Sequence, residues 1–407
     1  MPSAILFVMS WLVVFILQIL NGNDARLVAA VLAVAALGAV AAAVLAGRPG
    51  GAKVSPRMWR LGLLFLASLH LGYAGVQLKR AHVIDIATTT LEAGAVVKAG
   101  LNPYSADIDR AAVALLAGSN DKIDAERFKG YKYLPVMVAA YMPLGLGFGA
   151  SGLVATNFLL MGLLLAGIYR LGLEMGGGKD AGRWAVLLFA ALPLPLFQVY
   201  SKGVTDLVPV LPLVVALAIL RLRPGLAGFL IGLSIAAKLM PGLLLAPLFL
   251  PPSSRSKGIG PRWRYILGGL AGILPVLPYL LGAPKEFVDN VLIFNMLRPI
   301  DPTSWLYLMP GWLPGPLHIA FGLSWLGLAA AYWFRPVSIR WRATGACVVI
   351  ILMILAGPAM HENYMLWWLP FFAVLVGQLL GRRGVEDQPA TVEGLQHESL
   401  HRPAIEG

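Results

Sequence analysis

The sequence has little charge and almost no cysteine. Charged residues make up 13% of the 407 residues and hydrophobic residues 58%, whereas soluble domains carry about 25% charged residues. The composition therefore predicts a protein whose main solvent is lipid. The one cysteine, Cys347, lies within an apolar run, so it predicts neither an intrachain disulfide nor a cysteine-based metal site.

Several signature motifs are also missing. The chain has no GxxxxGK[ST] loop and no GxSxG elbow, one cysteine excludes a cysteine cluster, and the spacing around His361 does not fit HExxH. P-loop nucleotide hydrolysis and structural zinc therefore have no support, and we predict no metal site and no redox or nucleotide cofactor. The net charge of +12 does not predict nucleic-acid binding, because the basic residues lie between hydrophobic segments and form no single patch.

What the sequence does have is a series of long apolar runs. Residues 5–20, 27–46 and 61–78 reach or approach the roughly 20 residues that a helix needs to cross a bilayer. A backbone in lipid must satisfy its polar groups internally, so these runs predict helices. The predicted fold class is all-α, a polytopic membrane helix bundle of about ten to twelve transmembrane helices.

The basic residues between these runs predict the topology. When loops are assigned alternately to the two sides, eighteen Lys and Arg fall on one side and four in short loops of the other. The richer side is expected to be cytoplasmic, which places both termini there. The eighteen are Arg48, Lys53, Arg57, Arg60, Arg170, Lys179, Arg183, Arg221, Arg223, Arg255, Lys257, Arg262, Arg264, Arg335, Arg340, Arg342, Arg382 and Arg383.

We predict three regions on this basis. Residues 1–60 hold two extra transmembrane helices, 61–381 form the core with an exoplasmic segment at 79–152, and 382–407 form a disordered cytoplasmic tail. Further crossings are expected at 153–171, 184–200, 206–222, 264–281, 316–334, 343–357 and 365–381.

Two apolar stretches are expected to differ from simple crossings. Residues 226–250 are interrupted at Lys238–Gly242, where Pro241 removes a helical hydrogen bond, so two short helices are predicted. Residues 131–146 are short for a span. Counting them as a crossing would put every later basic loop outside, so we predict an interfacial or re-entrant helix.

Asp85 is the first candidate for chemistry. It follows the helix at 61–78 within a few residues and is expected at the outer membrane surface, where a carboxylate can act as a general base. The alternative is a helix-capping or solvated aspartate, which is the commoner role for such a residue. Glu92, seven residues on, is a second carboxylate that can take the same role.

Three cationic or titratable residues are the next candidates. Lys238 on the broken helix is costly in lipid and indicates a functional site, with snorkelling to the headgroups as the alternative. Arg298 in the outer stretch 283–315 can clasp a phosphate, or it can lie over lipid headgroups. His361 can shuttle a proton, or it can be a satisfied interfacial residue.

The order of these features resembles the polyprenyl-phosphate-dependent GT-C glycosyltransferases, and most closely glycosyltransferase family 87. An aspartate after an early helix, then an Asn-Pro-Tyr turn, then a Tyr-x-Pro segment opening a helix appear in that order over residues 60–381. The matching segments are Asp85, Gly100–Tyr104, Lys132–Pro135, Lys238–Pro241, Arg298–Pro299, Ser304–Trp305 and Tyr364–Pro370.

The resemblance implies an activity and a set of site residues. It implies an inverting transfer of a hexose, mannose being the implied sugar, from a polyprenyl-phosphate sugar to a lipid or glycan acceptor. Asp85 is then the general base, with His361 as a second catalytic residue, and the donor phosphate is bound by Arg298 and Lys238. The substrate-binding residues that it implies are Asn102, Tyr104, Lys132 and Tyr364. The need for a divalent cation stays open, because Asp85 has no acidic neighbour before Glu92.

Two other functions fit parts of the pattern. A transporter or lipid-linked sugar flippase is favoured by the broken helix at Lys238, because discontinuous helices commonly form substrate sites in carriers. The large outer segment at 79–152 and the absence of an obvious two-fold repeat favour the enzyme. A structural subunit of an envelope-assembly complex, with a degenerate site, is the third hypothesis.

Overall fold

The computed structural model describes residues 54–80, 84–118, 124–251, 259–301, 304–335, 337–358 and 361–386. Within these ranges the chain is helical, with no strands. The longer helices are α3 (Pro56–Arg80), α4 (Asp85–Lys98), α6 (Pro135–Gly172), α7 (Gly178–Ala191), α9 (Leu207–Ile219), α10 (Pro224–Ala237), α12 (Pro261–Ile273), α16 (Pro314–Phe334), α17 (Ile339–Ala356) and α18 (Met365–Glu386). The shorter ones are α5 (Arg110–Ala117), α8 (Pro193–Leu196), α11 (Leu239–Leu245), α13 (Leu277–Gly282), α14 (Pro284–Val288) and α15 (Phe294–Leu297). Single turns complete the chain at η1 (Ala125–Phe128), η2 (Leu173–Gly177), η3 (Phe197–Ser201), η4 (Leu274–Val276), η5 (Asp289–Ile293), η6 (Trp305–Leu308) and η7 (Glu362–Tyr364).

Five of the described helical stretches are long and apolar enough to cross a membrane. They are Pro56–Leu78, Pro135–Ala191, Pro261–Gly282, Pro314–Phe334 and Ile339–Ala356. Three shorter apolar helices accompany them at Leu207–Ile219, Pro224–Ala237 and Met365–Gly381. The prediction of an all-α bundle of apolar helices is confirmed at this level, while the two helices expected within residues 1–60 lie outside the described residues.

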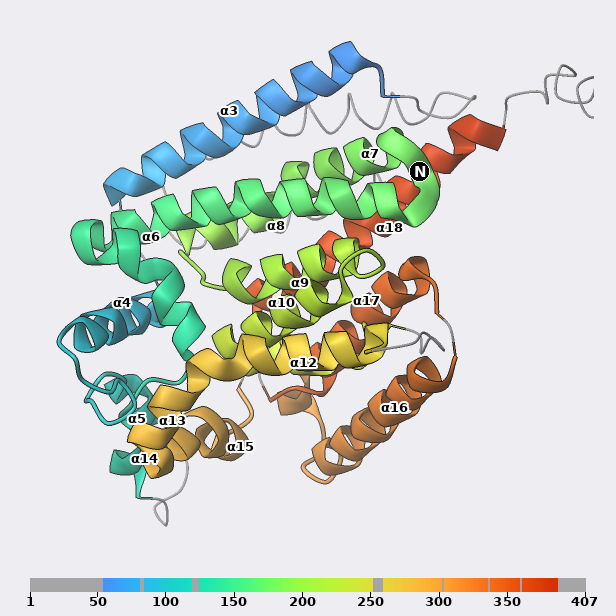
Figure 1. Ribbon diagram of the computed structural model, residues 1–407. Helices are drawn as coiled ribbons and strands as arrows, with labels where there is room; N and C mark the ends of the chain where they lie inside the picture. The colour runs from blue at the N-terminus through green and yellow to red at the C-terminus, as the bar shows by residue number, and fades with distance from the viewer. Residues whose placement is uncertain are drawn as a thin grey trace, which may run out of the picture.

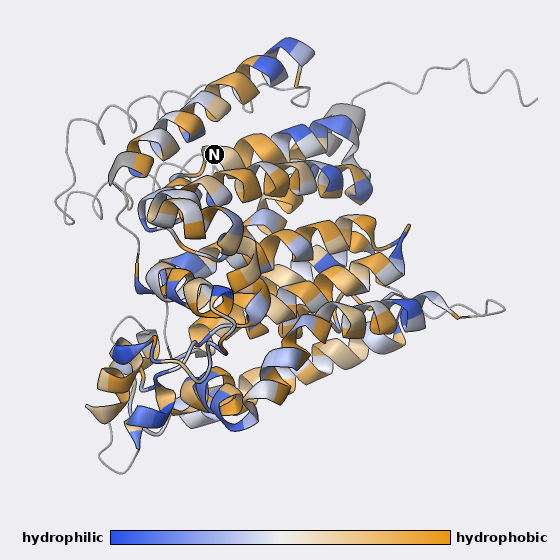
Figure 2. Cartoon of the chain, turned by 60° about the vertical axis from the view of Figure 1, so that its left-hand side comes forward, coloured by the Kyte–Doolittle hydropathy of each residue, from blue (hydrophilic) through white to orange (hydrophobic). Residues whose placement is uncertain are grey.

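The outer helices of the bundle expose apolar side chains. Along α16 only Pro314 and Tyr332 are buried, whereas Ile319 and Leu323 are each 65% exposed. In water such a surface would drive aggregation, but against lipid tails it has no cost. Figure 2 shows the same distribution, with hydrophobic residues along the helices and hydrophilic ones gathered toward their ends. These surfaces support a helical membrane bundle.

Two predicted crossings differ in detail from the structure. The run at 184–200 is divided, because α7 ends at Ala191 and the chain continues through Pro193 and Pro195 into α8 and η3. Pro193 lacks the N–H that would continue the helix. The last helix, α18, extends through Arg382 to Glu386 and so is longer than the expected 365–381.

The segment 79–152 lies at one end of the bundle. Its described part contains α4, α5 and the first part of α6, and these gather in Figure 1 beside α13, α14 and α15. The helix α6 bends at Gly149, whose φ of 57° and ψ of −133° are non-helical. The bend separates the stretch predicted as interfacial or re-entrant from the crossing predicted at 153–171, and its depth in a membrane stays a prediction.

The chain from α9 to α11 confirms the predicted helix break. Lys238 is extended (φ −151°, ψ 125°) and separates α10 from the seven-residue α11. Since α9 and α10 have 13 and 14 residues and a short connection, they form an antiparallel hairpin. The start of α9 and the end of α10 therefore lie at the same end of the bundle, which is where the candidate site forms.

Close packing of α10 against α12 depends on glycine. A Cβ on Gly232 would lie 2.8 Å from the Cα of Gly272, and a Cβ on Gly272 would lie 2.8 Å from the Cα of Gly232. These glycines belong to the two small-xxx-small patterns of the sequence, with Gly228 and Gly268, and such spacing lets helix backbones meet. The contact fixes α12 beside the hairpin.

We predict that Gly232→Ala separates α10 from α12 and destabilises the protein. The neighbouring atoms are backbone, so relief requires a shift of a whole helix, and overpacking of this kind costs roughly 1–3 kcal/mol. The melting temperature of the purified protein in detergent measures the loss. Gly322→Ala on α16 is the matched control, because a Cβ there meets nothing within 4 Å. Equal melting temperatures for the two variants would contradict the packing account.

Candidate functional site

A buried carboxylate, Asp206, lies at the centre of the site. It immediately precedes α9, is 0% exposed, and accepts hydrogen bonds from three side chains. Lys238 Nζ and Trp367 Nε1 donate to Oδ1 at 2.8 Å and 2.7 Å, and Asn363 Nδ2 donates to Oδ2 at 2.6 Å. Such charge-assisted bonds are among the strong hydrogen bonds of proteins. Asp206 therefore ties α9 to the end of α10 and to the start of α18.

Three aromatic rings surround the ammonium group of Lys238, which is also paired with Asp206. Its Nζ lies 5.3 Å from the ring centroids of Tyr133 and Tyr364 and 4.9 Å from that of Trp367. Its side chain is 11% exposed. The aromatic faces attract the ammonium and exclude water from the ion pair. Lys238 thus holds its charge inside the bundle instead of snorkelling, and Asp206 neutralises that charge.

The loop before Asp206 is held by Asn157 on α6. Its Nδ2 donates to the carbonyls of Val199 and Val204 at 2.9 Å and 3.0 Å, and its Oδ1 accepts from Tyr141 at 2.6 Å. Gly203, with a φ of 65°, allows the chain to turn back within this loop. The position of Asp206 is therefore set by a buried amide and by backbone geometry.

Arg298 and His361 form the second part of the site. Arg298 Nη2 lies 3.0 Å from His361 Nε2 and 3.5 Å from Asp301 Oδ2. Because a guanidinium only donates, Nε2 of His361 must accept in this pair, which requires the neutral ring with its proton on Nδ1. Arg298 Nε is buried without a partner among the described residues. The guanidinium keeps donors available for an anion.

The loop carrying Arg298 is fastened to the loop carrying His361. The Asp301 N–H donates to the Pro358 carbonyl at 2.7 Å, and Ser304 Oγ donates to the Gly357 carbonyl at 2.9 Å. The His361 and Tyr364 rings meet edge to face at 5.5 Å between centroids, which joins this pair to Lys238 through Tyr364. The predicted residues Lys238, Arg298, His361 and Tyr364 are therefore brought together.

Asp85 lies at the start of α4, near this cluster but outside it. Its side chain is exposed, and Oδ1 accepts from the Ile86 N–H at 2.8 Å. The chain just before it is fixed by a hydrogen bond of 3.0 Å from the Ile84 N–H to the Lys202 carbonyl. This bond to the next residue is not a helix cap, because the N-cap residue is Ile84 and no side chain caps α4. Asp85 Oδ2 has no protein partner in the described part of the chain, as a base requires.

Tyr133 lies beside the buried cluster, with Lys238 Nζ 5.3 Å from its ring centroid. Desolvation raises the pKa of its phenol well above the usual value, and the nearby Tyr364, Asp206 and Asp85 groups raise it further. The backbone of Tyr133 is also fixed, because the Tyr104 hydroxyl donates a hydrogen bond of 2.7 Å to the Tyr133 carbonyl.

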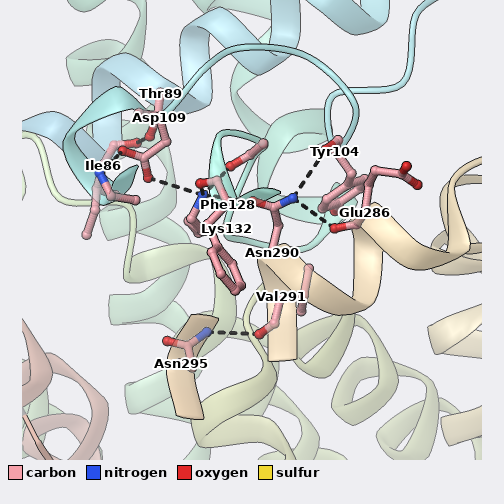
Figure 3. A network of polar contacts seen from close by, with 12 residues as sticks. Ile86, Thr89, Tyr104, Asp109, Phe128, Lys132, Glu286, Asn290, Val291 and Asn295 are labelled. Atoms are coloured by element: carbon pink, nitrogen blue, oxygen red, sulfur yellow. Dashed lines mark hydrogen bonds and ion pairs between the residues drawn. The ribbon is translucent and has the colours of Figure 1, made fainter. Parts of the chain in front are cut away.

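Lys132, another predicted substrate residue, belongs to a separate network of polar contacts, drawn in Figure 3. Lys132 is buried and donates to the carbonyls of Phe128 and Gly130 and, at 2.9 Å, to Asn290 Oδ1. Asp109 Oδ2 lies 3.8 Å from its Nζ. Burial lowers the pKa of Lys132 to about 8, and the Asp109 carboxylate opposes that change. This network joins the segment before α6 to η5.

Asn102 and Tyr104 are likewise occupied by protein partners. Asn102 Nδ2 donates to the Tyr279 carbonyl at 3.1 Å, and its Oδ1 accepts from the Tyr104 N–H at 3.1 Å. The Tyr104 side chain is 1% exposed. These two residues build the turn that supports Tyr133, so their polar atoms are not presented to a ligand in this structure.

Among the described residues, no group of three or more His, Cys, Asp and Glu side chains is placed to hold a metal ion. Comparison with family models, curated proteins and solved structures finds no match to this chain. The similarity to family 87 glycosyltransferases therefore rests on the motifs alone and stays a prediction.

Sequence reasoning did not single out Asp206 or Asn363. A signal for Asp206 was present, because the runs before and after the Arg221–Pro224 connection have nearly equal lengths. In an antiparallel hairpin the residue before the first run, Asp206, lies beside the residue after the second run, Lys238. Asn363 carried no comparable signal.

We predict that Asp206→Asn destabilises the protein by roughly 3–5 kcal/mol, because it leaves Lys238 buried and unpaired. Combining it with Lys238→Met should restore part of that loss, since the double variant has no unpaired charge. Thermal unfolding in detergent provides the double-mutant cycle.

The exposed pair Arg110–Glu126 supplies the control for this cycle. Both side chains are more than half exposed, so Glu126→Gln should change stability by less than about 1 kcal/mol. Additive losses for Asp206→Asn and Lys238→Met would show that the two charges do not depend on each other.

Proposed function

We propose that this chain is an integral membrane glycosyltransferase that transfers a hexose from a polyprenyl-phosphate sugar to a lipid or glycan acceptor. Mannose is the sugar that the motifs imply. The reaction takes place at the end of the bundle that carries Asp85, Arg298 and His361, and this end faces outward from a multi-pass protein of the cell membrane. Both termini lie in the cytoplasm.

The observation that carries the proposal is the convergence of residues that are far apart in the sequence. Arg298 and His361 are 63 positions apart and lie within hydrogen-bond distance. Lys238 contacts the ring of Tyr133, and the residue before Asp85 is hydrogen-bonded to Lys202, four residues before Asp206. A carboxylate and a cation near one surface are the groups that transfer from a phosphate donor requires.

The step proposed for these groups is a direct displacement. The acceptor hydroxyl oxygen forms a bond to the anomeric carbon as the bond between that carbon and the phosphate oxygen breaks, and the configuration inverts. The electron pair leaves with the phosphate, and the hydroxyl proton passes to Asp85 Oδ2. Arg298 donates hydrogen bonds to the departing phosphate, and His361 orients the guanidinium through Nε2.

The proposed roles of the two cations differ. Lys238 is already neutralised by Asp206 at 2.8 Å, so its main effect on the donor phosphate is to position Tyr133, Tyr364 and Trp367. The Arg298 side chain is 23% exposed and retains free donors, which makes it the main phosphate ligand of the proposal.

Asp85→Asn is predicted to abolish transfer while leaving folding and donor binding nearly intact. The amide oxygen can still accept from the Ile86 N–H, but the group has no basicity. Loss of general base catalysis typically lowers the rate roughly a hundredfold to ten-thousandfold. The measurement is transfer of radiolabelled sugar from a polyprenyl-phosphate donor by membranes containing the protein.

Glu92→Gln is the matched control for this test. Glu92 is also exposed and lies on α4, about two turns from Asp85. If Glu92→Gln is the inactive variant, the role of base belongs to Glu92 and the enzyme proposal survives. Full activity in both variants would overturn the mechanism.

Arg298→Lys keeps the charge but loses the planar fork, so we expect weaker donor binding. Loss of one charge-assisted hydrogen bond costs about 1.5–3 kcal/mol, or roughly ten- to hundredfold in KM for the donor. Arg110→Lys, at an exposed position at the same end, should leave KM unchanged. Unchanged activity in Arg298→Ala would remove Arg298 from the site.

A carrier is the alternative that one observation favours. The break between α10 and α11 places Lys238 beside a buried carboxylate, an arrangement also found where discontinuous helices bind substrates. Sealed vesicles with the labelled donor separate the possibilities. Transfer of sugar to acceptor supports the enzyme, movement of the intact donor across the membrane supports a carrier, and neither supports a structural subunit.

A further inference from the structure

A cavity of about 380 Å³ lies at the opposite end of α9 from Asp206. Leu220, Val337 and Ile339 form part of its apolar wall, and Arg221, Arg342 and Ser338 supply its polar groups. Since α9 has 13 residues, the cavity is about 20 Å from the candidate site along that helix. The volume is within the range of small-molecule binding sites, roughly 300–1,000 Å³.

Arg342 is the most unusual residue of this cavity. It is 2% exposed, Nη1 donates to the Leu248 carbonyl at 2.5 Å, and Nε donates to the Val337 carbonyl at 3.2 Å. A guanidinium has five N–H donors, and Nη2 has no protein partner within the described ranges. No carboxylate there pairs with Arg342 either. A buried charge without a counter-ion is costly, so the geometry calls for an anion.

Arg221 places a second positive charge on the same cavity. Two cations that share one cavity repel each other unless an anion lies between them. The first turn of α17 adds to this field, because Ser338 caps the helix and the positive end of an 18-residue helix begins there. A tetrahedral anion with several oxygens matches the two guanidinium forks.

We propose that this cavity binds a phosphate group through Arg221 and Arg342. Its source is either the headgroup of an anionic phospholipid or a free phosphate. The headgroup is favoured by position, because the cavity lies at the end of the bundle that carries Arg221, Arg262, Arg335 and Arg340, and basic pockets between membrane helices bind anionic headgroups. The site is independent of the proposed glycosyl transfer.

The test uses the full-length protein in detergent and native mass spectrometry. Phosphatidylglycerol, inorganic phosphate and diacylglycerol are added separately, the last being a lipid without phosphate. Arg221→Gln removes an exposed charge without burying an unpaired group, and Arg342→Lys keeps the charge but loses the fork. Arg340→Gln is the matched control, because Arg340 is exposed on the same turn of α17 and does not line the cavity.

Phosphatidylglycerol is expected to bind, and Arg221→Gln and Arg342→Lys should each weaken it at least about tenfold, whereas Arg340→Gln changes it less than about twofold. The same arginine dependence with inorganic phosphate alone would identify free phosphate as the ligand. Equal losses for Arg221→Gln and Arg340→Gln, equal binding of diacylglycerol, or unchanged binding in both cavity variants would overturn the proposal. Arg221→Gln decides the matter if Arg342→Lys fails to fold.

Discussion

The ion pair between Asp206 and Lys238 is the interaction on which the arrangement of the site depends. Neither charge can remain unpaired inside an apolar bundle, so the start of α9 and the end of α10 must stay together. Asn363 and Trp367 satisfy the remaining acceptor capacity of the carboxylate and bring α18 to the same point. A buried ion pair of this kind adds little net stability, but it specifies which helix ends meet.

The two ends of the bundle carry different chemistry because the helices between them are almost entirely apolar. One end collects carboxylates, aromatic rings and the Arg298–His361 pair. The other end collects arginines, of which Arg342 has no acidic partner among the described residues. Contact between α10 and α12 at Gly232 keeps the middle compact. Polar side chains therefore gather where helices end, and any substrate or headgroup meets the protein there.

The sequence was sufficient for the helices and insufficient for most side-chain pairings. Apolar runs predict helix positions, and Pro241 predicts the break after Lys238, because these depend on local chemistry. The pairing of Arg298 with His361 depends on loops that meet only in the folded chain. Lys132 was expected to meet a substrate, yet its ammonium is surrounded by backbone carbonyls, a role that a motif match cannot distinguish.

The orientation of the bundle is tested most directly by labelling each end with an impermeant thiol reagent in intact cells. Asp107 and Arg340 are exposed at opposite ends, and the native Cys347 is buried, so single cysteines at these two positions report the two sides. Asp107→Cys should react from outside, and Arg340→Cys should react only after the membrane is permeabilised. Labelling of Arg340→Cys in intact cells, with Asp107→Cys protected, would contradict an outward-facing site.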